Sequence, residues 1–506
     1  MNNKSSSILI TNLPTYDVLA PPGAFGMLTS VAASENYETV VADFNLYLYK
    51  NLSSAEWTDV NNYTSQLTKL FIADVLKKKI IKLWDKMLYD NIKSTNCDYL
   101  CISIFSMNSI LIARILLEHE ASKTKKTYKI IVGGNGTSSK FPETHETFME
   151  WNNSNHLADY VVQGDGEDAF AKILSNGMTT YNITDLDSLP MSDYSNINVS
   201  EYLEPKLYMT TSRGCVRHCT FCDIEGIWSK YTFRTPESLV KEIKHHVETT
   251  GITTFDFTDS LINGSSTNFY KFNSLLASEK AKHSYLEDVT YMGQSICKSR
   301  KSMPESHFEA MHYAGFQQLT VGIESFSESV RNHMKKKFTN DDIAYYLEQC
   351  GYWRINNVVL MLVGYPTETM QDHQDNIDAL YKYHRYSQLG IIELIRFGYT
   401  MQLHNGSPIN SDRSLKELGV YYDSPNPTDE ELTYMWRVTT NKDNTLAERL
   451  RRRMEMHELC VALNYMQPRV DDEMLYMKSL ASLSHNKTPE FGIVLTQFKP
   501  KEENNG

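Results

Sequence analysis

Short apolar runs alternate with stretches of helical periodicity over the first 195 residues. The runs begin at residues 8, 38, 98, 128 and 158 and read ILITNLP, ETVVADFN, DYLCISIF, YKIIVGGN and ADYVVQGDG. Strands separated by helix-length segments favour a parallel sheet with crossover helices. A run such as KIIVGG suits a strand that is buried on both faces. The pattern predicts a doubly wound, Rossmann-like α/β domain over residues 1–195. Within it, residues 53–94 have apolar positions at helical spacing, which predicts one or two amphipathic helices.

A second alternating array follows residues 184–198, which are polar and turn-rich and predict a linker. Six further strands are expected to begin at residues 207, 253, 288, 317, 356 and 390, and all but the last precede a segment with helical periodicity. Consecutive βα units of this kind predict a partial (β/α)6 barrel over residues 196–410. Its functional residues are expected at the carboxyl ends of the strands.

The strand patterns fade after residue 411, so residues 411–506 are predicted to form a small helical domain. Thr445 and Glu448 have the spacing of a capping box that opens a helix. We expect the basic run at residues 451–453 to face solvent on this helix. The last eight residues, KPKEENNG, are expected to be frayed.

Composition narrows the classes of function. The chain has 506 residues, of which 41% are hydrophobic and 22% charged, and its net charge is −12. These values are typical of a folded globular protein, and the acidic balance makes nucleic acid an unexpected partner. No run approaches the roughly 18 apolar residues that a membrane span needs. The first residues also lack a signal-peptide pattern. We therefore expect a cytoplasmic protein without a membrane span.

Three of the eight cysteines lie within one short segment, TTSRGCVRHCTFCD. Cys215, Cys219 and Cys222 have the spacing Cys-x3-Cys-x2-Cys, directly after a predicted strand. Three thiolates at this spacing can ligate a compact metal centre, but closed zinc sites and fully ligated [4Fe–4S] clusters usually have four protein ligands. The spacing therefore indicates a centre with one open coordination position. The alternative is a structural zinc site completed by His218 or a distant histidine.

The cysteine segment, with Phe221 before the last thiol, resembles the radical S-adenosylmethionine (SAM) superfamily. The resemblance implies that Cys215, Cys219 and Cys222 hold a [4Fe–4S] cluster, whose fourth iron is chelated by the amino and carboxylate groups of SAM. It also implies that an electron from the reduced cluster cleaves the sulfonium and releases a 5′-deoxyadenosyl radical. An electron donor such as flavodoxin or ferredoxin would then be a partner.

Further segments of the predicted barrel resemble the same superfamily. FDFTDSLING resembles the segment that meets the methionine moiety, and Asp259 is the candidate for the ammonium contact, although the usual Gly-Gly-Glu is absent. Glu324, in VGIES, corresponds to the position that faces the ribose hydroxyls. Gly364, in VGYPTET, is expected to let the backbone approach SAM. Phe221 completes the set of residues that the resemblance assigns to SAM.

The N-terminal segments resemble the cobalamin-binding domain that precedes the barrel in one class of these enzymes. Gly-rich turns after parallel strands allow close backbone approach to a ligand at the sheet edge. The resemblance places a cobalamin beside Ser103, Gly133, Gly134 and Gly164. The chain has no Asp-x-His-x-x-Gly motif, so a histidine ligand to cobalt is not expected.

The positions of the cysteines separate this chain from two related classes. A methylthiotransferase is expected to hold a second cluster on three N-terminal cysteines, and only Cys97 and Cys101 are available there. Auxiliary C-terminal clusters need several late cysteines, yet only Cys460 follows Cys350. We therefore predict a single cluster.

The resemblance implies an enzyme, most commonly a cobalamin-dependent methyltransferase that methylates an unactivated carbon of a small molecule. A radical rearrangement or cyclisation without methyl transfer is the enzymatic alternative. A non-catalytic cobalamin- or metal-binding module is a third, but such a module has no need of an open iron site. The sequence identifies no residue that acts on the substrate.

Overall fold

The computed structural model describes residues 6–466, apart from residues 15, 62–72, 93–96, 125, 142–145, 399, 405, 424 and 426–428. The chain forms two compact units. The first comprises residues 1–210 and 233–256, and the second comprises residues 211–232 and 257–506. The predicted three-part division at residues 195 and 410 stays a prediction. Among the described helices, none is both long and apolar enough to cross a bilayer.

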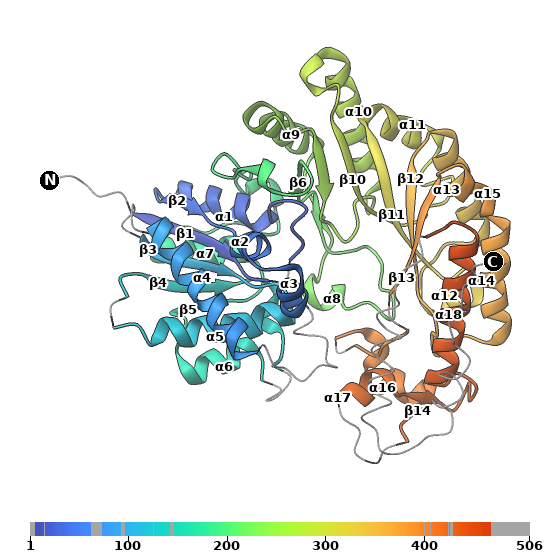
Figure 1. Cartoon of the computed structure of the whole chain (residues 1–506). Helices are drawn as coiled ribbons and strands as arrows, with labels where there is room; N and C mark the ends of the chain where they lie inside the picture. The colour runs from blue at the N-terminus through green and yellow to red at the C-terminus, as the bar shows by residue number, and fades with distance from the viewer. Residues whose placement is uncertain are drawn as a thin grey trace, which may run out of the picture. The chain divides into compact units, whose positions relative to one another are not determined.

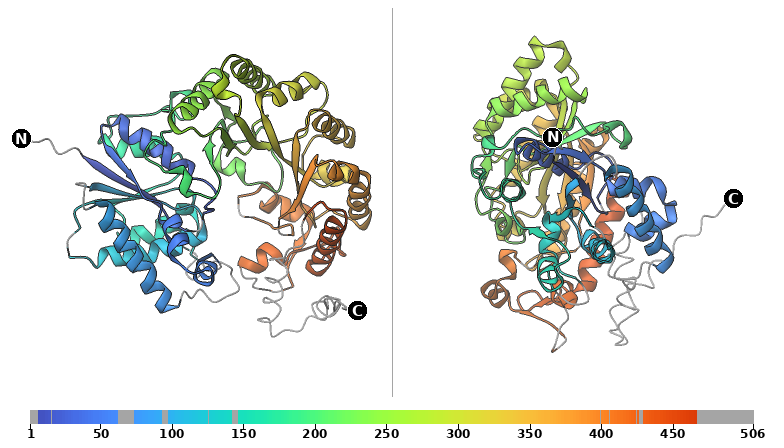
Figure 2. Two further views of the ribbon diagram at one scale, coloured as in Figure 1. Left: turned by 45° about the horizontal axis from the view of Figure 1, so that its top comes forward. Right: turned by 90° about the vertical axis from the view of Figure 1, so that its left-hand side faces the viewer.

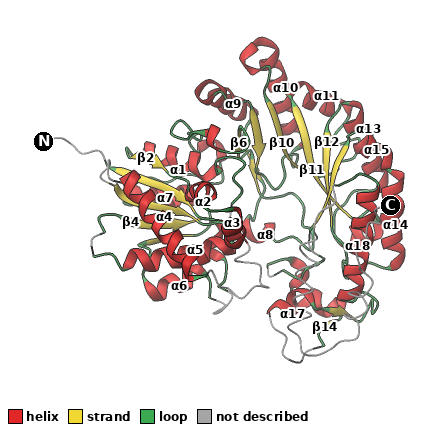
Figure 3. Cartoon of the chain, viewed as in Figure 1, coloured by secondary structure: helices red, strands yellow, loops and turns green. Residues whose placement is uncertain are grey.

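The first unit contains a five-stranded parallel sheet, which is drawn with its helices in Figures 1 and 3. Its strands are β1 (Ser7–Asn12), β2 (Glu38–Val41), β3 (Cys97–Ser103), β4 (Lys129–Gly133) and β5 (Tyr160–Val162). Their order is β2-β1-β3-β4-β5, and each neighbouring pair is parallel. The five predicted strands are therefore confirmed.

Consecutive side chains of a strand point to opposite faces of the sheet. Because the side chains on both faces are apolar, helices cover both faces of this sheet. Leu100 and Ile102 of β3 belong to one apolar core, whereas Cys101 belongs to the other. The first core packs under α2 (Phe44–Asn51), α4 (Asp74–Ile92), α5 (Met107–Ala121) and α6 (Phe148–Asn155), and the second under α1 (Gly23–Ser34) and α7 (Gly166–Leu174). This arrangement confirms the doubly wound prediction. Part of the predicted 53–94 insertion forms α3 (Ser54–Asn61) and α4, while residues 62–72 and 93–96 lie outside the described residues.

The second sheet has six strands in the order β13-β12-β11-β10-β9-β6. They are β6 (Lys206–Met209), β9 (Thr254–Phe257), β10 (Thr290–Ser295), β11 (Phe316–Glu324), β12 (Asn356–Met361) and β13 (Ile392–Phe397). The pairs from β10 to β13 are parallel. Helices lie along the outer side of these strands (Figure 2, left): α10 (Ser266–Lys282), α11 (Glu305–Ala314), α13 (Asn340–Tyr352), α14 (Met370–Lys382) and α15 (His384–Gln388). All six predicted strands are confirmed, in the sequential order of a partial (β/α)6 barrel.

The described C-terminal residues contain α16 (Asp412–Leu418), α17 (Asp429–Tyr434) and α18 (Leu446–Ala462). Thr445 caps α18, since its side chain accepts a hydrogen bond from the N–H of Glu448. The solvent-facing stripe predicted for residues 451–453 is wrong, because Arg452 and Arg453 are buried. Each finds polar partners on other parts of the chain. The segment KPKEENNG lies outside the described residues.

Candidate active site

The three clustered cysteines lie on a loop of the second unit, between β7 (Ser212–Arg213) and α8 (Ile224–Ile227). Cys219 is buried, whereas Cys215 and Cys222 are half-buried. Gly214 starts the loop with φ +79°, and a Cβ there would lie 2.6 Å from the backbone oxygen of Lys230. The tight turn at this glycine therefore opens the thiol-bearing loop directly after the strand.

Burial favours the protonated form of two of these three thiols. Burial raises the pKa of Cys219 to about 11 and also raises the pKa of Cys222, while the charge of Lys336 opposes both shifts. Deprotonation therefore needs a further positive centre, such as bound iron. His218 is exposed, and its Nδ1 lies 3.0 Å from Oε2 of Glu225, which argues against its completing a zinc site. The three sulfur atoms also do not all lie within 4.8 Å of one another, whereas a single zinc ion holds its thiolates about 3.8 Å apart.

Lys336 is a buried cation at this loop, and the sequence pattern did not indicate it. Its Nζ donates to Oε1 of Glu324 at 2.8 Å and to the backbone oxygen of Gly322 at 3.0 Å. The ammonium lies 5.4 Å from the ring centroid of Phe221. Lys335 and Lys337 on either side have φ values of +61° and +59°, an uncommon conformation for such residues. The strained turn directs the middle lysine of the MKKK run inward.

Glu324 stands at the end of β11 in a left-handed conformation, with φ +66°. The pairing with β12 shifts register between Gly322 and Glu324, which is the mark of a β-bulge. Bulges next to active sites re-aim a side chain. Here the bulge includes Glu324, whose carboxylate pairs with Lys336. This is the strand end where the sequence predicts the contact with the ribose of SAM. That contact stays a prediction.

Two more cations lie near Cys215. The backbone N–H of Arg217 lies 3.4 Å from the sulfur of Cys215, and Nε of Arg217 is buried without a hydrogen-bond partner. Nζ of Lys298 donates to the backbone oxygen of Gly264 at 3.2 Å. Burial and then the charge of Arg217 lower the pKa of Lys298, while Cys215 raises it. A loop of three thiols flanked by Arg217, Lys298 and Lys336 fits an anionic iron–sulfur cluster and its ligand.

Asp259 is buried and directed at the first strand of the barrel. Its Oδ1 accepts from the N–H of Thr211 at 2.8 Å, and its Oδ2 accepts from the Thr211 hydroxyl. Burial raises the pKa of Asp259 to about 6, although the Thr211 hydrogen bonds oppose this shift. The carboxylate therefore ties β9 to the strand end that leads into the cysteine loop. Its contact with the SAM ammonium stays a prediction.

Gly364 begins the turn after β12, and its φ is +85°. A Cβ on this residue would lie 2.3 Å from Cδ of Arg449, so the neighbour that excludes a side chain is a helix residue. The next residue reaches the cysteine loop, because the hydroxyl of Tyr365 lies 2.8 Å from that of Thr220. A cavity of about 220 Å³ adjoins this region and is lined by Phe221, Leu362, Thr400, Met401, Gln402 and His404.

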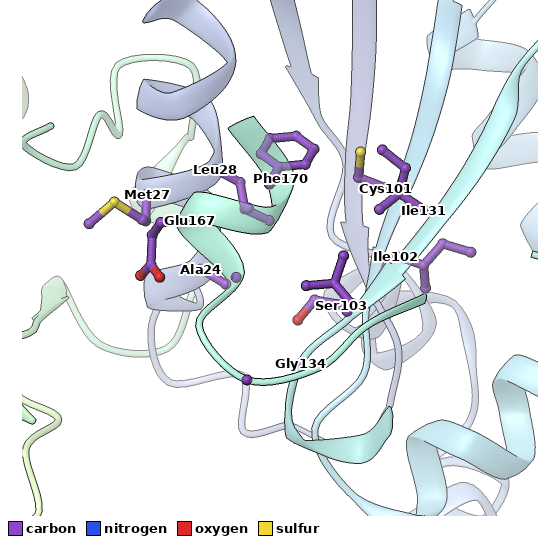
Figure 4. A pocket seen from close by; sticks show the side chains of 14 residues that line it. Ala24, Met27, Leu28, Cys101, Ile102, Ser103, Ile131, Gly134, Glu167 and Phe170 are labelled. Carbon is purple, nitrogen blue, oxygen red and sulfur yellow. The ribbon is translucent and has the colours of Figure 1, made fainter. Parts of the chain in front are cut away.

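The first unit contains a separate apolar cavity of about 200 Å³ at the carboxyl ends of β3, β4 and β5. Figure 4 shows Met27 and Leu28 of α1 and Phe170 of α7 around it. The predicted residues Ser103, Gly133, Gly134 and Gly164 all line this cavity. Gly134 has φ +105°, and a Cβ there would lie 2.4 Å from the backbone oxygen of Ile104. The sequence therefore placed these four residues together correctly, and the ligand they hold stays a prediction.

A comparison with protein-family models identifies one domain of the chain. Residues 209–380 match the model described as the radical SAM superfamily. The chain therefore contains a radical SAM domain. The match covers the cysteine loop, Asp259, Glu324 and Gly364, so it contains the whole site described above for the second unit apart from the contributions of residues 400–449.

Two curated proteins are similar in sequence to this radical SAM chain. A Methanocaldococcus jannaschii protein named as a methylthiotransferase is 25% identical over 335 residues, which are 60% of this chain and 69% of the relative. The cytidylyl-2-hydroxyethylphosphonate methyltransferase of Streptomyces wedmorensis is 27% identical over 169 residues, 31% of this chain. That second alignment spans only 30% of the relative's own length.

Solved structures share the fold of this radical SAM chain. The radical SAM methyltransferase TsrM of Kitasatospora setae, solved with cobalamin and a [4Fe–4S] cluster, has a TM-score of 0.57 at 14% identity, over 84% of this chain and 82% of TsrM. The cobalamin-dependent SAM radical enzyme OxsB, solved with aqua-cobalamin and SAM, has a TM-score of 0.62 at 14% identity. That match covers 98% of this chain and 70% of OxsB. Both likenesses confirm the predicted fold class.

The two N-terminal cysteines of this radical SAM chain lie in different apolar cores. Cys97 packs in the core on one face of the first sheet, and Cys101 packs in the core on the other face. Burial raises the pKa of both thiols. The single cluster expected from the sequence stays a prediction.

One other group of potential metal ligands occurs within the described part of the chain, where ligand atoms of Asp85, His119 and Glu120 converge. The ammonium of Lys123 lies 2.7 Å from the Asp85 carboxylate and 2.6 Å from that of Glu120. A protein cation therefore already neutralises this group, which forms a structural ion network.

Proposed function

We propose that this radical SAM enzyme is a cobalamin-dependent C-methyltransferase that acts on a small molecule. The observation that carries the proposal is the cavity of the first unit, because four residues predicted to meet cobalamin line it at the carboxyl ends of parallel strands. The matching fold of two cobalamin enzymes supports it. The methyltransferase from Streptomyces wedmorensis, whose name specifies a small phosphonate, supports it from sequence.

In this proposal, the second unit holds the cluster and SAM. Cys215, Cys219 and Cys222 would hold three irons and leave one position open for SAM. When bound, the cluster with SAM would supply a 5′-deoxyadenosyl radical, and cobalamin would supply the methyl group. The chain's own residues would bind and orient SAM. Nζ of Lys336 donates to Oε1 of Glu324 at 2.8 Å, and this contact would hold the carboxylate in place for the ribose hydroxyls. The ring of Phe221 and the side chains of Leu362 and Met401, which line the adjoining cavity, would exclude water from the adenosyl group.

The first unit would hold the cobalamin tail by shape. Its cavity wall is largely apolar, with Met27, Leu28, Ile131, Val162 and Phe170 among the lining residues. The glycine turns leave the cavity open at the strand ends. The residues that line the cavity include no histidine, which agrees with the absence of the cobalt-ligating motif from the sequence. The base of the cofactor would therefore be buried in an apolar site without a protein ligand to cobalt.

Two parts of the proposal concern partners. The substrate would be a small molecule, in line with the acidic net charge of −12. Cluster reduction requires a one-electron donor, such as reduced flavodoxin or ferredoxin. A radical rearrangement or cyclisation without methyl transfer is the second candidate, since the fold match to the cobalamin-dependent SAM radical enzyme OxsB extends over 98% of this chain.

Product analysis under anaerobic conditions tests the proposal. The cluster-loaded chain is incubated with reductant, cobalamin, SAM and candidate small molecules, and 5′-deoxyadenosine and S-adenosylhomocysteine are quantified by mass spectrometry. A cobalamin-dependent methyltransferase produces both compounds. Deoxyadenosine alone would instead support the rearrangement enzyme, and S-adenosylhomocysteine must disappear when cobalamin is left out.

A further inference from the structure

Helix α18 packs three buried arginines against the barrel, two of them near the turn after β12. Arg449, Arg452 and Arg453 are 0%, 0% and 6% exposed. Burying a guanidinium is costly unless hydrogen bonds and an opposite charge compensate it. Here the partners are backbone oxygens and the carboxylates of Glu368 and Glu448, so α18 is held by oriented hydrogen bonds in addition to apolar packing.

Glu368 links α18 to the turn that begins at Gly364. It is fully buried, and its Oε2 accepts from the N–H of Gly364 at 3.1 Å. Its Oε1 accepts from Nη1 of Arg452 at 3.1 Å, and the same nitrogen donates to the backbone oxygen of Glu368 at 3.0 Å. The carboxylate therefore transmits the position of the helix to the backbone of Gly364.

Arg449 makes a second contact with the same turn. Its guanidinium lies 3.7 Å from the ring centroid of Trp436 and donates to the backbone oxygens of Tyr434 and Asn444 at 2.6 and 2.9 Å. Its aliphatic stem occupies the space that a side chain at Gly364 would need. The glycine and the arginine thus fit each other, and movement of either would displace the turn.

The Gly364 turn also contacts the cysteine loop. Nδ2 of Asn444, just before α18, donates to the backbone oxygen of Tyr365 at 2.8 Å. The Tyr365 hydroxyl lies 2.8 Å from that of Thr220, which stands between Cys219 and Phe221 in the sequence. A continuous set of contacts therefore runs from α18 through residues 364–368 to the thiol-bearing loop.

We propose that Arg452, acting through Glu368, is a positioning residue that holds the Gly364 turn in the geometry that SAM binding requires. The proposal rests on the proposed function, since it takes this turn as part of the SAM site. It assigns α18 a role in cofactor affinity as well as in folding. Neither residue is among those assigned to the cluster or to SAM.

Variants of the cluster-loaded protein test this role. SAM affinity per cluster is measured by equilibrium dialysis, together with iron content and the unfolding midpoint. Arg452→Met should weaken SAM binding at least tenfold while the iron content stays near wild type. Glu368→Gln should lose less SAM affinity, because the amide oxygen of the new side chain can still accept a hydrogen bond from the N–H of Gly364. Arg452→Lys should restore part of the affinity.

Arg451→Met is the matched control, because Arg451 is on the same helix and pairs with Glu448 and Glu455. The SAM affinity of this variant should be unchanged.

The outcomes separate this inference from the function on which it rests. Cluster-loaded wild type that binds no SAM would overturn both. If wild type, Arg452→Met and Glu368→Gln all bind SAM equally well per cluster, the positioning role alone is overturned. The positioning role is likewise overturned if the variants lose only iron and thermal stability. If Arg452→Met does not fold, Glu368→Gln and Arg452→Lys decide the question.

Discussion

The ion pair of Lys336 and Glu324 lies beside the thiols of the candidate active site. Lys336 is 5% exposed, so its charge acts on Glu324 and on the neighbouring thiols with little screening by water. Glu324 in turn is held at a strand end by a bulge and a left-handed backbone. A positive φ is uncommon for a residue other than glycine, and such backbone strain is typical of ligand-binding positions.

Replacing Glu324 with Gln should weaken SAM binding and leave the cluster in place. The substitution keeps the size of the side chain but removes the charge that pairs with Lys336 and would accept from the ribose hydroxyls. We expect about a tenfold loss of SAM affinity, the magnitude of one lost charge-assisted hydrogen bond. Glu328→Gln, at an exposed carboxylate on α12 (Glu328–His333), is the control. Unchanged SAM affinity in the Glu324 variant would contradict the assignment.

The sequence predicted some residues of this site and missed others for physical reasons. The three cysteines carry their chemistry in their spacing. Lys336 was missed because a run of lysines ordinarily faces solvent, and only the positive φ values beside it turn its side chain inward. Arg452 was missed for a similar reason, since its partner Glu368 is 84 positions away in the sequence. Contacts between distant residues leave no local pattern.

At the scale of elements, the apolar pattern was sufficient to predict the strands. KIIVGG and LCIS are apolar on both faces because helices cover both sides of the first sheet. The glycines at the strand ends predicted the cavity, because Gly134 and Gly164 have positive φ values that few other residues adopt. What the pattern did not predict was the packing of α18, which depends on arginine contacts with the β12 turn.

Replacing Gly134 with Val should impair cobalamin binding. The φ of +105° and the 2.4 Å approach to Ile104 leave no room for a side chain, so the cavity wall must shift. Retention of hydroxocobalamin after desalting, followed by absorbance, should fall at least tenfold, with iron content unchanged. Gly177→Val is the matched control, because Gly177 has φ +86° but open space around it. Equal retention by both variants would show that the cavity does not hold cobalamin.

At the scale of the whole molecule, a buried charge network in the first unit links stability to pH. Glu242 of α9 (Pro236–Thr250) is 2% exposed and pairs with Arg234. Burial alone would raise the pKa of Glu242, but His246 and Arg234 outweigh it and hold the pKa at about 2. Its carboxylate also accepts from the backbone N–H of Ser192 at 3.3 Å, which binds the predicted linker to this helix.

This pKa gives a signed prediction for stability. A carboxyl group whose folded pKa lies below its unfolded value of 4.5 stabilises the protein above that pH and loses this contribution as the pH falls through about 2. Glu242→Gln should therefore lower the free energy of unfolding at pH 7 by on the order of 3 kcal/mol. The difference in the free energy of unfolding between this variant and wild type, measured by urea unfolding, should be smaller at pH 3 than at pH 7. Glu248→Gln, at an exposed position of α9, should behave as wild type, and a gap that is equal at both pH values would refute the prediction.

The central claim is that Cys215, Cys219 and Cys222 hold a cluster with an open position for SAM. Electron paramagnetic resonance of the reduced, iron-reconstituted protein tests it most directly. Wild type should give the signal of a reduced [4Fe–4S] cluster, and the addition of SAM should change that signal. Cys219→Ala should lose both the iron and the signal, whereas Cys350→Ala, at a buried cysteine of α13, should retain them. A wild-type signal that SAM leaves unchanged, or a Cys219→Ala protein with its full iron content, would contradict the claim.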